Sequence, residues 1–131
     1  MIVIDASAVL ELLLGTEKGR KLEGRAFAPD ERLHAPHLMD IEVTQALRRL
    51  TLLKEITPTR AKTALGDYAA LLIERSPQYD FLLRIWDLRD SVTAYDAAYV
   101  TLAEALEAPL LTCDGKLARS HGHRAKIELV E

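Results

Sequence analysis

The order of apolar and polar residues predicts short buried strands that alternate with helices. Residues 2–4, Ile-Val-Ile, form an uninterrupted apolar run, which is typical of a central strand in a parallel sheet covered by helices on both faces. Residues 6–14 have helical composition, and Gly15 follows as a stop signal. Three later runs are also expected to be strands: 33–35, 110–113 and 127–130. The alternation favours an α/β fold with a mostly parallel sheet and right-handed crossovers.

The helical segments differ in how clearly the sequence marks them. Residues 38–54 carry apolar side chains at helical spacing, and Glu42 falls at the margin of that apolar stripe. Thr57-Pro58 is a typical helix start, with the threonine as N-cap and the proline in the first helical position. Residues 71–74 fit either the end of that helix or a short strand. Further helices are expected at 17–27, from Ser76-Pro77 onward, at 93–107 with Ser91 or Thr93 as cap, and at 116–119. One face of the 93–107 helix consists of small residues, so we expect it to lie close against a sheet.

Length and composition indicate one domain, 1–131, that is large enough to bury a core. No uncharged stretch approaches the roughly 18 residues that a membrane helix needs, and the apolar amino terminus lacks the basic start of a signal peptide. The single cysteine, Cys113, excludes an internal disulfide, so we expect a reducing, cytoplasmic compartment and no membrane partner. The net charge of −3 argues against a general nucleic-acid coat but allows a local basic groove.

Four acidic residues are expected at one edge of the predicted sheet. Asp5 and Asp114 each follow a buried strand, and ligands bind outside the carboxyl ends of the strands in such sheets. Glu42 and Asp96 lie early in helices that run antiparallel to the strands, which brings them to the same edge. Each acid also has a structural explanation as a cap, a turn residue or a surface side chain. Independent caps would gather at this edge too, because helices begin there.

A cluster of carboxylates is chemically suited to a hard divalent cation. Neighbouring carboxylates raise one another's pKa, and bound Mg²⁺ or Mn²⁺ offsets that repulsion through oxygen ligands. Such a site predicts metal-assisted hydrolysis of a phosphodiester. The chain offers no Ser-His-Asp set, glycine-rich phosphate loop or cysteine nucleophile as a competing site. His121-Gly122-His123 is expected to be an exposed turn rather than a metal site.

Segments from all parts of the chain resemble the PIN domain of VapC-type ribonuclease toxins. They are Ile2–Ser7, Glu42 in a helix after Ala35-Pro36, Arg89–Tyr99 with its Tyr-Asp-Ala-Ala-Tyr block, and Leu110–Asp114. The resemblance covers essentially the whole chain and implies a PIN-like three-layer α/β/α domain. It implies a Mg²⁺-dependent endoribonuclease, with Mn²⁺ as a substitute, that is the toxin of a toxin–antitoxin pair. It also implies a homodimer that a small antitoxin protein neutralises.

The resemblance also assigns roles to individual residues. It implies that four acids bind the metal and carry catalysis: Asp5, Glu42, Asp96 and Asp114. Ser7 and Thr112 are implied as supporting polar residues near them. Gln45 departs from the family pattern, because many relatives carry asparagine three residues after the helix glutamate. Glutamine can still donate a hydrogen bond, but from a longer side chain.

Charged partners are expected at the same edge of the sheet. Arg89, Lys116 and Arg119 lie a few residues from Asp96 or Asp114, so we expect these three cations to bind the RNA backbone. An acidic pocket without metal attracts a guanidinium, so we expect an arginine of the antitoxin to insert there.

Two other functions fit parts of the pattern. A non-catalytic PIN-like binding module would use the same acids only as structural caps. A phosphatase or phosphotransferase would use Asp5 as a covalent nucleophile, but such enzymes often carry a second acid two residues later, where this chain has Ser7. The presence of all four acids speaks against a loss of activity.

Overall fold

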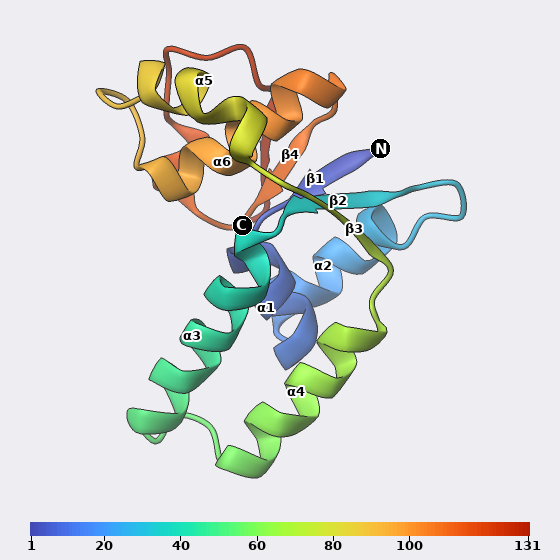
Figure 1. Ribbon diagram of the computed structural model, residues 1–131. Helices are drawn as coiled ribbons and strands as arrows, with labels where there is room; N and C mark the ends of the chain where they lie inside the picture. The colour runs from blue at the N-terminus through green and yellow to red at the C-terminus, as the bar shows by residue number, and fades with distance from the viewer.

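A five-stranded sheet runs through the chain, and the structure, a computed structural model, describes all residues from 1 to 131 (Figure 1). The strand order is β3-β2-β1-β4-β5, and every neighbouring pair is parallel. The strands are β1 (Ile2–Ile4), β2 (Leu33–Pro36), β3 (Ile73–Ser76), β4 (Leu110–Thr112) and β5 (Ile127–Leu129). The predicted parallel sheet is confirmed, and the ambiguous segment 71–74 contributes the start of β3.

Strand β1 occupies the centre of this sheet, which explains its uninterrupted apolar sequence. Val3 aligns with His34 of β2 on one side and with Leu110 of β4 on the other. All three residues of β1 are fully buried, because helices cover both faces of the strand. Since all strands point the same way, their carboxyl ends lie at one edge, where Asp5 directly follows β1.

Seven α-helices complete the three-layer α/β/α arrangement. They are α1 (Ala6–Leu14), α2 (Glu17–Ala26), α3 (Leu38–Leu52), α4 (Pro58–Ala70), α5 (Leu82–Asp87), α6 (Ala94–Leu106) and α7 (Gly115–Ala118), with a 3₁₀ turn, η1 (Tyr79–Phe81), before α5. Helix α6 packs on β1, β2 and β4, and α5 packs against α6. Helix α1 lies on the opposite side of the sheet together with α2, α3 and α4 (Figure 1). None of these helices is both long and apolar enough to cross a membrane.

Local signals set the ends of several helices as predicted. Gly15 ends α1 in the left-handed conformation, with φ of 64°, and its N–H reaches carbonyls of the last turn. The hydroxyl of Thr57 accepts a backbone N–H at the start of α4. Thr93, rather than Ser91, caps α6 by accepting the N–H of Asp96 at 3.1 Å. The cap therefore places Asp96 in the first turn of α6.

The helix predicted from Ser76-Pro77 onward begins later than expected. Ser76 is the last residue of β3, and its carbonyl accepts the N–H of His37 at 3.0 Å. The chain then passes through η1, and α5 spans only Leu82–Asp87. The pairing of β3 with β2 thus overrides the local helix signal at Ser76.

Helix α6 is buried more completely than its small-residue face predicts. All residues from Ala97 to Ala103 are buried, whereas Ala94 and Ala105 are exposed. The sheet covers one side of α6 and α5 covers another. Larger side chains of α6, such as Tyr99, therefore belong to the core.

A polar contact fixes the start of α3, the helix that carries Glu42. Asp40 Oδ1 accepts hydrogen bonds from the hydroxyl of Tyr68 in α4, at 2.5 Å, and from Nε of Arg75 in β3, at 2.8 Å. The Arg75 guanidinium also lies 5.2 Å from the centre of the Tyr68 ring. These contacts tie α3 to α4 and β3 two residues before Glu42 and thereby limit where Glu42 can lie.

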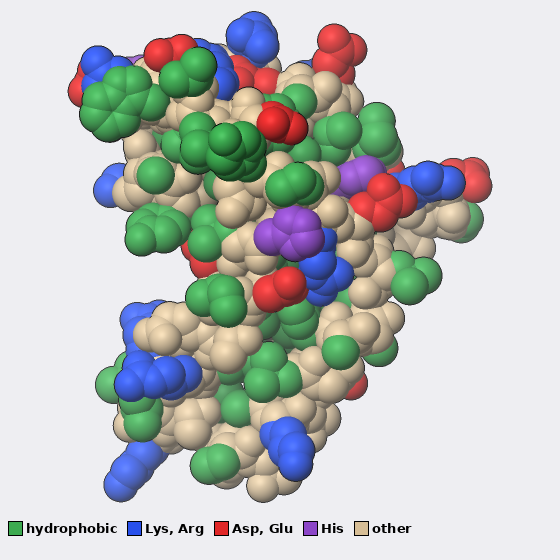
Figure 2. Space-filling view, viewed as in Figure 1, with side chains coloured by type: hydrophobic (Ala, Val, Ile, Leu, Met, Phe, Trp, Pro, Cys, Tyr) green, Lys and Arg blue, Asp and Glu red, His purple; other side chains and the backbone are tan.

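Apolar side chains are exposed over η1 and α5. Tyr79, Leu83 and Trp86 expose 79%, 84% and 64% of their surface. Figure 2 shows apolar side chains gathered at the upper left of the molecule, where α5 lies in Figure 1, with basic side chains nearby. This short segment is therefore a surface feature as well as a connection to α6.

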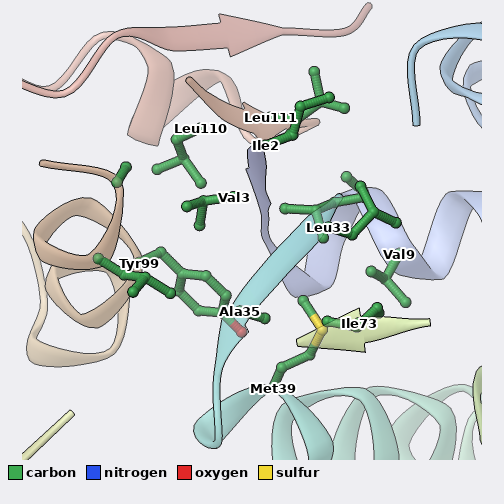
Figure 3. Packing of buried hydrophobic residues seen from close by; sticks show 14 of the residues in the cluster. Ile2, Val3, Val9, Leu33, Ala35, Met39, Ile73, Tyr99, Leu110 and Leu111 are labelled. Atoms are coloured by element: carbon green, nitrogen blue, oxygen red, sulfur yellow. The ribbon is translucent and has the colours of Figure 1, made fainter. Parts of the chain in front are cut away.

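The core connects the sheet to the helices on both of its faces. Figure 3 shows the ring of Tyr99 beside Ala35 of β2, with Val3 and Leu110 of the neighbouring strands packed in the same cluster. The Tyr99 hydroxyl leaves this apolar cluster at the carboxyl edge of the sheet, where it meets Glu42. One side chain thus links the core to the acidic edge.

Candidate active site

Asp5 follows β1 and caps α1. Its Oδ1 accepts the N–H of Ala8 at 3.0 Å and the hydroxyl of Ser7 at 2.7 Å. Its Oδ2 accepts the hydroxyl of Thr112, the last residue of β4, at 2.5 Å. Only 6% of Asp5 is exposed. The carboxylate is therefore held in one orientation at the carboxyl ends of the two central strands.

Ser7 and Thr112 connect the ends of β1 and β4. Ser7 Oγ accepts the N–H of Cys113 at 3.0 Å while it donates to Asp5. Thr112 Oγ1 accepts the N–H of Asp114 at 2.9 Å while it donates to Asp5. Each hydroxyl thus accepts a backbone N–H and directs its own proton to the carboxylate of Asp5.

Glu42 reaches this edge from α3 and is held by a residue that sequence reasoning did not identify as part of a site. Its Oε1 accepts the hydroxyl of Tyr99 at 2.6 Å. Burial and the adjacent Glu42 raise the pKa of Tyr99, so the phenol stays protonated and donates. Tyr99 follows Asp96 by three residues in α6, so the two side chains share one side of that helix. That spacing was the available sequence signal for Tyr99.

Asp96 and Asp114 lie in or next to the first turns of their helices. Asp96 is half-buried in the first turn of α6. Asp114 caps α7, since its Oδ1 accepts the N–H groups of Lys116 at 2.9 Å and Leu117 at 3.3 Å. The capping explanation is therefore correct for Asp114, as it is for Asp5. Capping uses one oxygen of Asp114 and leaves the other available to a ligand.

The acids share one electrostatic environment. Burial raises the pKa of Asp5 despite its hydrogen bonds, and the charge of Asp96 raises it further. Burial likewise raises the pKa of Glu42 against the hydrogen bond from Tyr99, and the charges of Asp96 and Asp5 add to the rise. Burial and the charge of Asp114 raise the pKa of Asp96. The carboxylates therefore repel one another, and none of them forms a salt bridge.

The chemistry of this donor set fits a hard divalent cation. The side chains do not form a closed cage, because no three His, Cys, Asp or Glu side chains are arranged to hold an ion as they stand. Repulsion between uncompensated carboxylates works against such closeness. Mg²⁺ sites consist of oxygen donors that carry concentrated negative charge. The acids at this edge provide such donors, and none of them is paired with a side-chain cation. A divalent ion among these acids would offset the repulsion that their raised pKa values reveal.

Two of the three basic residues expected to bind RNA lie beside Asp96. Arg89 and Lys116 line a pocket of about 270 Å³ together with Asp96. Arg119 is not part of this pocket. Its guanidinium lies over Gly115, where Nη1 would be 2.9 Å from an added Cβ. The sequence therefore predicted one group of three cations, and the structure assembles only two of them around a common space.

Two other segments singled out by the sequence do not join the acids. Gln45 is exposed on α3 and lines a pocket together with Glu42, but its side chain forms no hydrogen bond with Glu42 or any other residue. The His121-Gly122-His123 segment is irregular, as expected, and His123 Nε2 lies 2.9 Å from the hydroxyl of Ser120.

Comparison with known proteins identifies relatives of the chain. Residues 2–121 match the family described as PIN domain. Ribonuclease VapC12 of Mycobacterium tuberculosis is 43% identical over 130 residues, which cover 99% of both chains. VapC ribonuclease Mb0985 of Mycobacterium bovis is 39% identical over 130 residues, which cover 99% of this chain and 98% of that protein. The crystal structure of PAE2754 from Pyrobaculum aerophilum superimposes with a TM-score of 0.69 and 27% identity, covering 96% of this chain and 81% of that one. The chain therefore belongs to the PIN-domain family and is a relative of the VapC ribonucleases.

Proposed function

We propose that this protein is a Mg²⁺-dependent endoribonuclease that acts as the toxin of a toxin–antitoxin pair. The main support is the arrangement of four acids, which come from separate parts of the chain and share the carboxyl edge of one sheet, and of which Asp5, Glu42 and Asp96 have a raised pKa from burial and from the charge of a neighbouring acid. Identity of 43% to ribonuclease VapC12 along nearly the whole chain supports RNA as the substrate.

The proposed metal ligands are the carboxylates of four residues: Asp5, Glu42, Asp96 and Asp114. Their all-oxygen chemistry suits Mg²⁺, with Mn²⁺ as a substitute. When bound, such an ion lowers the pKa of a water molecule and stabilises charge on the attacked phosphate.

The residues around the acids hold them in a fixed orientation. Ser7 and Thr112 donate to Asp5 from opposite sides and restrict its rotation. Tyr99 donates to Glu42 and keeps that side chain at the edge of the core. Partners that orient a ligand in this way commonly change metal affinity by about 10-fold to 100-fold. These contacts support a role for Asp5 and Glu42 beyond that of a cap or a surface acid.

RNA is proposed to lie along the basic side of the acids. Arg89 and Lys116 share a pocket with Asp96 and form no salt bridge, so both cations are available to phosphates. Arg119, which follows α7 and lies outside this pocket, is proposed to make a more distant backbone contact.

The proposed protein partners are a second copy of the chain and a small antitoxin. A guanidinium carries the charge and the hydrogen-bond donors that a cluster of carboxylates accepts, so an arginine of the antitoxin is proposed to occupy the acidic pocket in place of the metal. The single free cysteine, Cys113, is compatible with the cytoplasm as the site of action.

The decisive experiment is cleavage of RNA by the purified protein, freed of antitoxin, in Mg²⁺ and in EDTA. We expect cleavage only with the divalent ion and only in the wild type, not in the Asp5→Asn variant. Because water is the proposed nucleophile, the products should carry 5′-phosphate and 3′-hydroxyl ends. Cleavage in excess EDTA, or 2′,3′-cyclic phosphate ends, would contradict the proposal. An intact RNA under all conditions would favour a non-catalytic binding module.

A further inference from the structure

Trp86, the single tryptophan of the chain, is exposed next to the pocket that contains Asp96. It lies in the last turn of α5, in the same segment as the exposed Leu83. The guanidinium of Arg89 lies 4.7 Å from the centre of the Trp86 ring. Arg89 Nη1 also donates to the carbonyl of Trp86 at 3.1 Å. The guanidinium is thus held over one face of the exposed indole ring.

The same Arg89 belongs to the pocket beside the acids. This pocket of about 270 Å³ is lined on one side by Asp96 and on another by Lys116. Ser91 and Thr93 contribute polar groups to its wall. The pocket therefore combines phosphate-binding cations with one of the proposed metal ligands, and the Trp86–Arg89 pair lies at its margin.

An exposed aromatic ring next to basic side chains is a combination that proteins use to bind nucleic acids. Aromatic rings and guanidinium planes stack on bases, and every base has a face that can stack. In an RNA duplex the base faces are covered by neighbouring base pairs, so only an unpaired base can reach such a pair. A backbone cation next to a stacking surface is how proteins bind single strands.

We propose that Trp86 and Arg89 stack one unpaired RNA base, while the adjoining pocket holds the phosphate of that nucleotide beside the bond to be cleaved. The proposal rests on the ribonuclease function proposed above and adds to it a position that binds one base. Trp86 is then a specificity-determining residue that contacts the substrate outside the acid set.

The single tryptophan allows a direct measurement that does not depend on catalysis. A short unstructured oligoribonucleotide is titrated into the protein in EDTA, where the RNA stays intact, and Trp86 emission is followed. Stacking predicts saturable quenching by the single strand and little or none by the same sequence as a perfect duplex. Equal quenching by both forms, or emission that changes with protein concentration and not with RNA, would overturn the proposal. Emission that depends on protein concentration alone would place Trp86 in a contact between two copies of the protein.

Matched variants separate stacking from general surface effects. Trp86→Leu should weaken binding of the single strand by roughly 5-fold to 150-fold, the range for loss of one base–aromatic stack. Trp86→Phe, which retains an aromatic face, should recover most of that loss. Tyr79→Leu is the control, because Tyr79 is an even more exposed aromatic residue of the same segment that does not line the pocket. Binding is measured by anisotropy of a labelled RNA. Equal affinities of the Trp86→Leu variant and the wild type for the single strand would refute the proposal that Trp86 stacks on a base.

The results also distinguish this proposal from the function on which it rests. RNA that quenches Trp86 but is never cleaved in Mg²⁺ would retain the stacking site and reject the nuclease. Normal cleavage by a Trp86→Leu variant with unchanged affinity would retain the nuclease and reject the stacking site.

Discussion

Replacement of Asp5 by asparagine separates a metal ligand from a helix cap. The asparagine Oδ1 can still accept from Ala8 and Ser7, so capping of α1 survives. The new amide nitrogen faces Thr112, whose hydroxyl can accept from it and turn its own proton toward Ser7 Oγ, 3.3 Å away. The substitution therefore removes a charge while the surrounding hydrogen bonds remain satisfied.

Removal of this charge should stabilise the metal-free protein by roughly 0.5–2 kcal/mol. The sign follows from the raised pKa of Asp5, because burial and the charge of Asp96 outweigh the hydrogen bonds that favour the ionised form. The magnitude is of the order of one like-charge repulsion at effective dielectric constants between about 80 at the surface and about 20 in a partly buried site. Each kcal/mol should raise Tm by about 4 °C in a domain of this size.

The stability difference should also depend on pH. A carboxyl whose folded-state pKa is raised binds its proton more tightly in the native state than in the unfolded state. The wild type therefore loses stability relative to Asp5→Asn as pH rises from the unfolded pKa of Asp5, near 3.8, through the higher folded value. Below that window Asp5 is protonated in both states, and the charge-related advantage of the variant disappears.

Thermal melts in EDTA and in millimolar Mg²⁺ test this reasoning. Mg²⁺ should stabilise the wild type by mass action, because the ion binds the native state, and should stabilise Asp5→Asn far less. Cleavage of RNA should be lost in the variant. If both proteins gain the same stability from Mg²⁺ and both cleave RNA, Asp5 is only a cap and the proposed site is wrong.

Three further predictions concern the surroundings of the acids. Tyr99→Phe removes the hydrogen bond to Glu42 and should weaken Mg²⁺ binding by about 10-fold to 100-fold. Binding is measured as the Mg²⁺ concentration that gives half of the rise in Tm, and an unchanged concentration would show that Glu42 does not need this hydrogen bond to bind the ion. Joint neutralisation of Arg89, Lys116 and Arg119 should raise the RNA concentration needed for cleavage and reduce the salt dependence by up to about one counterion per lost contact. Loss of only two contacts would agree with the position of Arg119 outside the pocket, whereas an unchanged salt slope would place the RNA elsewhere. Substitution of the antitoxin's arginines one at a time should release toxin activity at one position, and inhibition that survives every substitution would reject arginine insertion.

The sequence predicted where Asp5, Asp96 and Asp114 lie in the fold, because each follows or begins an element whose boundary a local signal marks. The Ile2–Ile4 run identifies a buried central strand, so the residue after it had to lie at the carboxyl edge. The threonine cap at Thr93 likewise placed Asp96 in a first turn. Boundaries of this kind depend on neighbouring residues, which is why they can be read from the sequence.

Contacts between distant segments could not be predicted in the same way. The bond from Tyr99 to Glu42 joins residues 57 positions apart, and it exists only because α3 and α6 meet at the edge of the sheet. Lys116 and Arg119 are close in sequence, yet only Lys116 lines the pocket, because Arg119 follows the last residue of α7 and its guanidinium lies over Gly115. At Ser76 the local helix signal was overridden by strand pairing, which no local pattern encodes.

The hydrogen bond from Thr112 to Asp5 joins residues 107 positions apart, and this separation has a consequence for biosynthesis. The ribosome synthesises β1 first. Strand β4, whose Thr112 donates the hydrogen bond to Asp5, follows only after most of the domain has been made. Contacts of such long sequence separation form late, since a large loop must close before they become favourable. A nascent chain therefore carries Asp5 without the strand that orients it. The proposed nuclease can become active only after β4 has been synthesised and paired, so unfinished chains should be harmless to the cell that makes them.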